Sequence, residues 1–367
     1  MVAFLRLYLA GCAFWLTLFD LLAHLLNWRG LRWSGPGLYG LTLLLWLRSQ
    51  RDLWREGALR GIGVLLLTLI PSVVAQLILA SVRNWHYNPR QRLHPATYGD
   101  RTITRLDIPA RHGPVPALYV VPAGGAVAAV SLAHGSGSDK VFYTWEIVDA
   151  LIAEGIAVLL IDMDGHGESE RPQRFPHIIY TVADAVGWLR ERHSRVGAIG
   201  VSLGGCVSAR ATAEGMSVDA LVIIGSPPQL HLEPWHVRRE AIGLARYSAL
   251  RQLQHGSPYH LVRAWTTTPP IRAAISTWDL IEALDLPGSL CHIGERDDVQ
   301  VPLLLVYGDS DALIPPASRA QIQAALPSWG QFHLLKRTTH LSLSIDPRMN
   351  RLVSAWLARH LVPQHVE

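Results

Sequence analysis

The sequence predicts a membrane-anchored α/β protein: a doubly wound, mostly parallel sheet with a helical cap insertion, preceded by N-terminal transmembrane helices. Three observations predict it. Long apolar segments are confined to residues 1–82, strand and helix patterns alternate from residue 101 onward, and the alternation breaks down between residues 226 and 301. We therefore expect four segments, namely an anchor, a first core part, a helical cap and a second core part, at residues 1–83, 84–226, 227–300 and 301–367.

The composition excludes several classes of protein. The 367 residues are 49% hydrophobic and 17% charged, with a mean hydropathy of +0.19, so the chain can bury a core and is not disordered. Three cysteines supply neither a disulfide framework nor a four-cysteine zinc site. The net charge of +4 comes from 33 basic residues, nearly all arginine, that are scattered outside the anchor. Nucleic acid is therefore not an expected partner.

Two apolar segments are long enough to cross a bilayer. Leu7–Trp28 and Gly61–Val82 each contain 22 residues, which reach about 33 Å as a helix against a hydrocarbon core of about 30 Å. Trp33–Leu47, which lies between them, contains only 15 residues. It can cross the bilayer only if its flanking arginines snorkel to the lipid headgroups; otherwise it forms a re-entrant segment or lies in the membrane interface. The sequence predicts two or three spans, and the alternative is a set of buried helices in a soluble domain.

The orientation of the anchor depends on the arginines beside the last span. A cleaved leader is not favoured: the apolar segment continues beyond the lipoprotein-like Leu9-Ala10-Gly11-Cys12, and no small-residue cleavage site precedes Asn27. Basic connections stay cytoplasmic, so an excess of arginines before the span favours a C-terminal domain outside the cytoplasm of a bacterial inner membrane. The excess is four against three: Arg48, Arg51, Arg55 and Arg60 against Arg83, Arg90 and Arg92. The side of the membrane on which the C-terminal domain lies therefore stays open.

The elements of the C-terminal part follow from the spacing of its apolar residues. Continuous apolar runs predict strands buried on both faces, and apolar residues three and four apart predict helices. The expected strands are 101–108, 117–121, 127–133, 156–161, 196–201, 220–224, 301–307 and 331–335. The expected helices are 141–154, 178–192, 203–214, 317–326 and 347–360. The stretch from 226 to 301 is expected to be helical and to pack on top of the sheet.

Gly200-Val201-Ser202-Leu203-Gly204 carries the strongest chemical signal. A predicted strand ends at Val201 and a predicted helix begins at Leu203, and so sharp a turn needs glycines where the two elements nearly touch. The turn exposes the Ser202 hydroxyl beside a helix N-terminus, which favours developing negative charge. Ser202 is therefore the predicted nucleophile, with an inert serine in a tight turn as the alternative.

His134-Gly135-Ser136-Gly137 follows the strand expected at 127–133. Its glycines let the backbone present an N–H group toward the nucleophile. The backbone N–H groups of Ser136 and Leu203 are the expected oxyanion-hole donors. A glycine loop that binds nothing is the alternative.

A serine nucleophile needs a base, and the base needs a carboxylate that fixes its tautomer. His340 follows the strand expected at 331–335, and Asp309 and Asp311 follow the strand expected at 301–307. We expect a triad of Ser202, Asp311 and His340. Asp309 is the rival acid, although its position next to the strand end favours a turn cap.

This arrangement resembles the α/β-hydrolase superfamily, in which the triad follows the chain order Ser, Asp, His. The resemblance covers roughly residues 101–361. It implies that Ser202 is the nucleophile, that Asp311 of Gly308-Asp309-Ser310-Asp311 is the acid, that His340 is the base, and that residues 226–300 form the variable cap.

A second loop narrows the resemblance. Asp162-Met163-Asp164-Gly165-His166-Gly167-Glu168-Ser169 is similar to the D-x-x-G-H-G-x-S loop of lysophospholipase-, monoacylglycerol-lipase- and serine-aminopeptidase-like members. We expect this loop to be structural, with Asp162 bound to nearby backbone N–H groups and His166 outside the catalytic set. Cys206, one turn after Ser202, is expected in the core.

The expected function is that of a serine hydrolase that cleaves a carboxylic ester, possibly of lipid type, through an acyl-enzyme on Ser202. Its expected partners are the membrane and a small acyl substrate. The cap is nearly neutral and carries Trp235, Trp265 and Trp278, which suits a lipophilic acyl chain. An acyltransferase, thioesterase or peptidase with the same triad, and a non-catalytic ligand-binding or scaffold protein, are the alternatives.

No cofactor is expected, and no metal. His231, Glu233 and His236 lie close together in the cap, but their spacing matches no zinc motif. The oligomeric state is left open.

Overall fold

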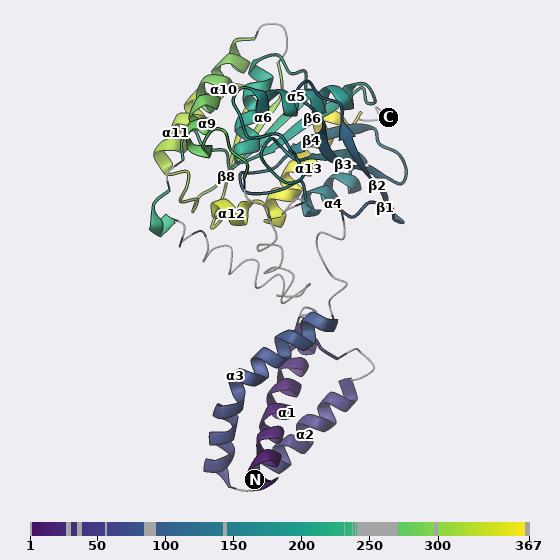
Figure 1. The fold of residues 1–367 in the computed structure, drawn as a ribbon, viewed down its shortest axis with the longest axis vertical. Coiled ribbons are helices and arrows are strands. Elements are labelled where there is room, and N and C mark those ends of the chain that lie inside the picture. Colours follow the sequence, from purple (N-terminus) through teal and green to yellow (C-terminus); the bar gives the residue numbers. More distant parts are fainter. Residues whose placement is uncertain are drawn as a thin grey trace. The chain divides into compact units, whose positions relative to one another are not determined.

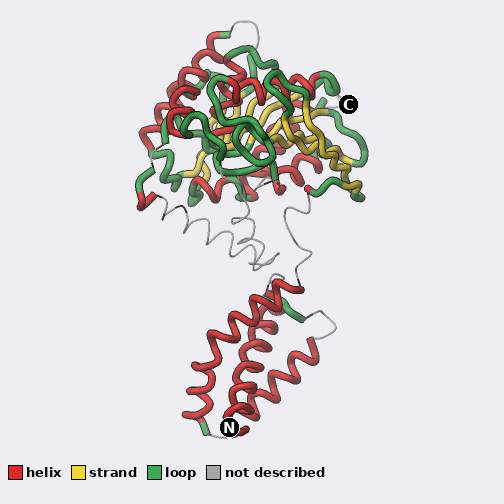
Figure 2. Tube along the Cα trace, in the orientation of Figure 1, coloured by secondary structure: helices red, strands yellow, loops and turns green. Residues whose placement is uncertain are grey.

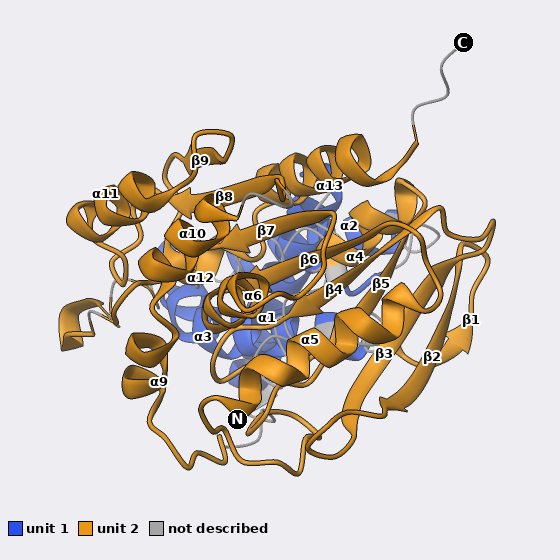
Figure 3. Cartoon of the chain, turned by 90° about the horizontal axis from the view of Figure 1, so that it is seen from above, with its two compact units in different colours: residues 1–91, 246–267 blue, residues 92–245, 268–367 orange. Residues whose placement is uncertain are grey.

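The computed structural model describes most of the chain (Figure 1). The described residues are 2–26, 31–34, 39–55, 57–83, 93–141, 145–230, 232–236, 238, 240, 271–296 and 300–363. They fall into two compact units, the first built on residues 1–91 and the second on residues 92–245 and 268–367 (Figure 3). The finer predicted division into anchor, core, cap and core stays a prediction. Trp265 and His231 of the predicted cap lie outside the described residues.

The described residues of the first unit form the helices α1 (Val2–Leu25), α2 (Tyr39–Trp54) and α3 (Ala58–Arg83), and α1 contacts both of the others. Two segments of these helices, Phe4–Leu25 and Ala58–Ala80, are long and apolar enough to cross a membrane. Both agree with the predicted long segments.

The prediction for the middle segment was wrong in its bounds. We expected an apolar segment at 33–47 and a basic connection after it, but α2 spans Tyr39–Trp54 and contains Arg48 and Arg51. Helix continues past the leucines because Ser49 and Leu53 are buried while the arginines stay exposed, and straight-chain side chains favour helix. The count of arginines in a connection before the last span is therefore smaller than the sequence suggested.

Small residues let α1 and α3 approach closely. A Cβ atom added to Gly11 of α1 would lie 2.6 Å from Thr68 Oγ1 and 2.8 Å from Val64 Cγ1 of α3. The indole of Trp15 donates to the Leu65 carbonyl at 2.9 Å, so the two helices are also joined by a hydrogen bond. Close contact through small residues and interhelical hydrogen bonds is typical of helices that associate without a hydrophobic driving force.

The carboxylate of Asp20 is fully buried in the first unit. It accepts hydrogen bonds from the backbone N–H groups of Trp33 at 2.9 Å and Ser34 at 3.2 Å. These bonds compensate the cost of burying the charge and fasten residues 33 and 34 to α1.

The second unit is built on a single sheet (Figure 2). Among the described residues, nine strands pair in the order β1-β2-β3-β5-β4-β6-β7-β8-β9. Neighbouring strands pair antiparallel along β1-β2-β3-β5. They pair in parallel along β5-β4-β6-β7-β8-β9. The strands are β1 (Ala96–Thr97), β2 (Arg101–Ile108), β3 (Val115–Pro122), β4 (Ala128–Ala133), β5 (Ile156–Ile161), β6 (Val196–Val201), β7 (Ala220–Ile224), β8 (Leu303–Gly308) and β9 (Gln331–Leu335).

Helices cover both faces of the sheet and bury two hydrophobic cores. One core contains residues of α4 and α13, and the other contains residues of α5, α6, α9, α10 and α11. Along β5, side chains alternate between the cores: Ala157, Leu159 and Ile161 enter one and Ile156, Val158 and Leu160 the other. The helices are α4 (Trp145–Ala153), α5 (His177–Arg190), α6 (Leu203–Ala213), α9 (Thr277–Leu284), α10 (Leu286–Glu295), α11 (Pro316–Ala325), α12 (His340–Leu343) and α13 (Pro347–Leu361).

The predicted doubly wound, mostly parallel sheet is confirmed. Five predicted strands have the observed bounds, namely 101–108, 156–161, 196–201, 220–224 and 331–335. The parallel pairing brings the carboxyl ends of β4, β6 and β8 to the same edge of the sheet, where the predicted site residues follow them.

We expect a valine at Gly11 to destabilise the first unit by about 1–3 kcal/mol, because its side chain would collide with Thr68 and Val64. Gly63→Val is the matched control, since nothing lies within 4 Å of a Cβ atom at Gly63 in α3. The midpoint of thermal unfolding of the helical signal in detergent measures both variants. Equal midpoints for the two variants would contradict the close contact of α1 and α3.

Candidate active site

Ser202 occupies a strained turn between β6 and α6. Its backbone has φ 51° and ψ −115°, a conformation that residues other than glycine rarely adopt. The Ser202 N–H donates to the Ile224 carbonyl at 2.8 Å, which extends the pairing of β6 with β7 into the turn. A Cβ atom on Gly204 would overlap the carbonyl oxygen of Ala133 at the end of β4. The sharp turn predicted from the glycines is therefore present.

The structure brings Ser202, His340 and Asp311 together. His340 Nε2 lies 3.1 Å from Ser202 Oγ, and His340 Nδ1 lies 2.8 Å from Asp311 Oδ2. A carboxylate only accepts, so Nδ1 carries the proton and Nε2 presents its lone pair to the Ser202 hydroxyl. This is the arrangement in which a histidine removes the proton of a serine nucleophile. The catalytic role of the three residues stays a prediction.

The two candidate acids have different roles in the structure. Asp311 is buried, and its second oxygen, Oδ1, accepts from the backbone N–H groups of Leu313 at 2.9 Å and Ile314 at 3.1 Å. Within the described residues, Asp309 makes no hydrogen bond to His340. It accepts from the Arg337 N–H at 2.7 Å and the Ser310 hydroxyl at 2.8 Å, and so holds the turn together.

The surroundings of His340 favour its protonated form. Burial lowers the pKa of the imidazole, but the charge and hydrogen bond of Asp311, together with the charge of Glu240, outweigh this effect. The pKa of His340 is therefore raised above its usual value of 6.5. A raised pKa strengthens the imidazole as a proton acceptor, and it also means that the base is lost to protonation at a higher pH.

The loop after β4 passes directly beside the nucleophile. A Cβ atom on Gly135 would lie 3.3 Å from Ser202 Cβ and 4.0 Å from Ser202 Oγ. Within the part of the chain that the structure describes, the N–H groups of Ser136 and Leu203 donate to no protein acceptor. An oxyanion-hole donor must be free of other acceptors, as these two N–H groups are within the described residues, and their role stays a prediction.

His134 fixes the start of this loop. Its Nε2 accepts from the Met163 N–H at 3.2 Å, so its Nδ1 carries the proton and donates to the Gly135 carbonyl at 2.8 Å. Burial lowers the pKa of His134, which favours this neutral form. The histidine thus joins the loop after β4 to the loop after β5.

The loop after β5 is structural, as predicted. Asp162 accepts from the backbone N–H groups of Lys140 at 2.7 Å and Glu168 at 2.8 Å, which confirms the expected ties. His166 is buried, and its Nδ1 bonds the Asp164 carbonyl at 2.9 Å. Burial and the neighbouring His134 lower the pKa of His166 to about 4, so it stays neutral at physiological pH.

Cys206 also agrees with its predicted core position. The thiol is fully buried in α6, and burial raises its pKa to about 12. A thiol with this pKa is not a nucleophile at neutral pH.

Glu240 contacts the site and was missed from the sequence. It is buried, and its carboxylate accepts from the N–H groups of Ala312 at 3.0 Å and Leu341 at 3.1 Å. These two residues directly follow Asp311 and His340. Glu240 belongs to no motif, so no pattern in the sequence indicates this contact.

The described residues contain no cluster of three or more histidine, cysteine or carboxylate side chains that could hold a metal. Of the predicted weak candidates, Glu233 accepts from the Trp235 indole at 2.6 Å, and the His236 ring accepts from the Glu233 N–H at 3.1 Å. Both of these side chains have partners within the protein.

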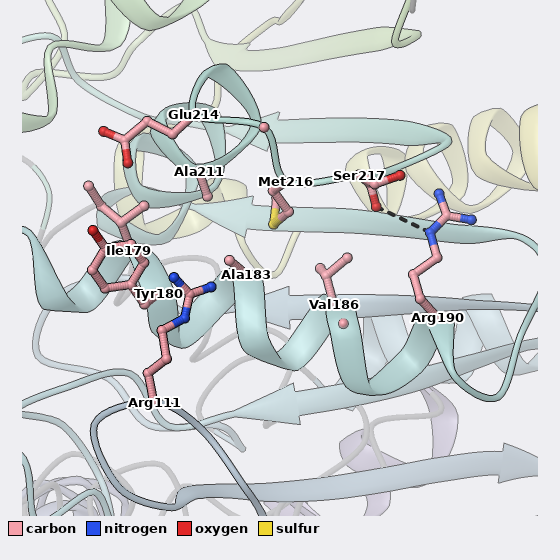
Figure 4. Close-up of a pocket in the computed structure, with 12 residues that line it drawn as sticks. Arg111, Ile179, Tyr180, Ala183, Val186, Arg190, Ala211, Glu214, Met216 and Ser217 are labelled. Atoms are coloured by element: carbon pink, nitrogen blue, oxygen red, sulfur yellow. Dashed lines mark hydrogen bonds between the residues drawn. The ribbon is translucent and has the colours of Figure 1, made fainter.

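A cavity of about 290 Å³ lies between α5 and the end of α6 (Figure 4). It is at the opposite end of α6 from Ser202, and its two arginines are engaged: Arg111 pairs with Asp184, and Arg190 donates to the Ser217 carbonyl at 3.2 Å. This cavity is separate from the candidate active site.

The chain is similar to known proteins in sequence and in fold. A family model described as serine aminopeptidase, S33, matches residues 124–347, which include Ser202, Asp311 and His340. Uncharacterized proteins of Mycobacterium tuberculosis and Mycobacterium bovis are each 24% identical over 302 residues, which cover 72% of this chain and 82% of each relative.

Solved structures share the fold. The alpha/beta hydrolase GrgF from Penicillium superposes with a TM-score of 0.53 at 18% identity, covering 72% of this chain and 99% of that one. A thermophilic esterase from Thermogutta terrifontis gives 0.52 at 18% identity, covering 71% and 100%. With the family model matching more than half of its length, the chain is an α/β-hydrolase-type hydrolase and belongs to the serine aminopeptidase S33 family.

Proposed function

We propose that the protein is a membrane-anchored serine hydrolase that cleaves a carboxylic ester through an acyl-enzyme on Ser202. The observation that carries the proposal is the hydrogen-bonded chain from Ser202 Oγ through His340 to Asp311, with distances of 3.1 and 2.8 Å. A serine hydroxyl is a weak nucleophile without such a base, and the base is weak without such a carboxylate.

The reaction follows from the direction of these hydrogen bonds. Ser202 Oγ attacks the acyl carbon while His340 Nε2 takes the hydroxyl proton, and the carbonyl oxygen becomes an oxyanion. The N–H groups of Ser136 and Leu203 stabilise this charge, each by about 3 kcal/mol. Collapse of the intermediate breaks the ester C–O bond, and the leaving alcohol takes the proton from His340.

Hydrolysis of the acyl-enzyme repeats the sequence with water. His340 Nε2 takes a proton from the attacking water, and the second oxyanion collapses with release of the free acid. The proton on His340 returns to Ser202 Oγ. Asp311 remains ionised throughout and stabilises the imidazolium in both halves.

The apolar character of the predicted cap favours a lipophilic acyl group. Outside residues 4–82, six large hydrophobic side chains are exposed among the described residues, and three of them, Leu232, Trp235 and Trp278, belong to the predicted cap. Trp278 directly follows Thr277, whose hydroxyl lies 3.2 Å from the Ser136 hydroxyl. Exposed apolar side chains in the predicted cap, one of them next in sequence to a residue that contacts the loop after β4, suit an acyl chain better than a polyanion.

The surface of the first unit supports the anchor. Of the 28 exposed large hydrophobic side chains among the described residues, 22 lie between residues 4 and 82. Only 28% of the apolar segment of α1 and 22% of the apolar segment of α3 are buried. A core helix of a soluble protein would be mostly buried, so lipid is the solvent that fits these surfaces.

The proposed triad predicts how substitution of each member changes probe labelling and ester turnover. Ser202→Ala should remove labelling by a fluorophosphonate probe and lower ester turnover by a factor on the order of 10⁶. Asp311→Asn should lose about 10⁴ in turnover, because His340 would hold the wrong tautomer. Asp309→Asn is the matched control and should cost far less, since Asp309 bonds only the turn.

Turnover is measured with p-nitrophenyl esters of increasing chain length and with a matching peptide amide. Labelling that persists in Ser202→Ala would refute the nucleophile, and a reversed order of the two aspartate variants would refute the acid. Cleavage of the amide alone would replace the esterase by a peptidase.

The anchor makes a separate prediction. The full chain should stay in the membrane pellet after alkaline carbonate extraction. Ile70→Lys should reduce this retention, since a charge at the centre of a span costs on the order of 3 kcal/mol. If the helix were surrounded by water, the same substitution would leave stability nearly unchanged, because the Ile70 side chain is 75% exposed. Leu334→Lys, at an exposed site of the second unit, is the control. Extraction of the wild type by carbonate would refute the anchor.

A further inference from the structure

Glu240 holds two loops that carry the proposed catalytic residues. Its Oε1 accepts from the Ala312 N–H at 3.0 Å and its Oε2 accepts from the Leu341 N–H at 3.1 Å. Ala312 belongs to the loop after β8 and Leu341 to α12, the short helix after β9. One carboxylate therefore joins segments that are 72 and 101 residues away from it in the chain.

The burial of this carboxylate indicates a specific purpose. Glu240 is 2% exposed, and removing a carboxylate from water is costly unless hydrogen bonds replace the lost solvation. Both oxygens receive such bonds from backbone N–H groups, and the histidine next to one of these donors carries the compensating positive charge when it is protonated. A side chain that only filled space would be apolar.

The two bonded residues are the immediate neighbours of Asp311 and His340. The distance between the carboxylate and the imidazole of the triad depends on the separation of these two loops. Within the described residues, Asp311 Oδ1 is bound to its own loop, through Leu313 and Ile314. Before Asp311 and His340 in the chain, the Ser310 N–H donates to the Thr338 carbonyl at 3.1 Å and the Arg337 N–H donates to Asp309 at 2.7 Å, so the two segments are joined on that side. Glu240 adds a tie on the other side, through the residues that follow Asp311 and His340.

We infer that Glu240 is a positioning residue of the hydrolase, which sets the approach of Asp311 to His340 by binding the backbone next to each. The inference rests on the proposed function, because a positioning role has meaning only if the triad performs the reaction. Glu240 lies within the predicted cap, so this part of the chain contributes a residue to the alignment of the triad.

The charge of Glu240 supplies a readout that a purely structural residue lacks. Two carboxylates act on the His340 imidazole, Asp311 and Glu240, and both raise its pKa against the effect of burial. Removing the charge of Glu240 lowers the pKa of His340. The base is then deprotonated at lower pH, so the acid limb of the pH profile of kcat/KM should move to lower pH.

The test compares Glu240→Gln with Glu240→Asp in the full chain. Glutamine removes the charge and turns a donor toward one of the two N–H groups, so kcat should fall about 10- to 100-fold with little change in KM, and the acid limb should move to lower pH. Aspartate keeps the charge, so its acid limb should stay near that of the wild type. Glu191→Gln is the matched control, because its side chain is 73% exposed and pairs with Arg192.

Two outcomes would overturn the inference. One is a Glu240→Gln variant with the kcat and the acid limb of the wild type. The other is a loss of activity that accompanies a lower unfolding temperature while the acid limb stays in place, which would assign Glu240 a structural role alone.

A second measurement separates this inference from the proposed function. The pKa of His340 can be followed through the NMR signal of its ring proton without any substrate, and Glu240→Gln should lower it. If the wild type neither hydrolyses esters nor reacts with the fluorophosphonate, the proposed function fails, whereas this titration still reports whether Glu240 acts on the histidine.

Discussion

The turn at Ser202 is the constraint on which the second unit depends. A strand and a helix meet there with one residue between them, and the backbone of Ser202 is held at φ 51°. The turn is possible because Gly200 and Gly204 leave no side chain between β6, α6 and the end of β4. The strain is compensated by pairing on both sides, since the Ser202 N–H bonds the Ile224 carbonyl and its carbonyl accepts from Gly205 and Cys206.

Buried carboxylates fix the remaining loops in relation to this turn. Asp162, Asp311 and Glu240 are all nearly inaccessible, and each accepts at least two backbone N–H groups. A carboxylate bound in this way fixes the position of the loops, because its hydrogen bonds are charge-assisted and directional. The loops at the carboxyl edge of the sheet are therefore arranged by ionised groups, and the triad is one part of this arrangement.

How much could be predicted from the sequence depended on whether the signal was local. Strands such as 156–161 were exact because burial on both faces leaves a continuous apolar run, and the Ser202 turn was found because its glycines are adjacent in the chain. The bounds of α2 were missed because leucines, serine and arginines all permit helix, and tertiary burial of Ser49 and Leu53 decided the outcome. Glu240 could not be found, since its two partners are distant in sequence and are backbone groups without a residue type.

The two units differ in which kind of side chain they bury and which kind they expose. In the second unit, apolar side chains alternate into two cores and the exposed surface is largely polar. In the first, the buried positions include Gly11, Thr17, Asp20, Thr68 and Ser72, while leucines and isoleucines face outward. An inverted surface of this kind supports the proposed membrane location, because in water it would gain little from folding and would favour aggregation. Under the proposed function, a hydrolase domain tied to such a unit would stay where lipophilic esters accumulate, and the anchor would contribute to substrate selection by raising the local ester concentration at the active site.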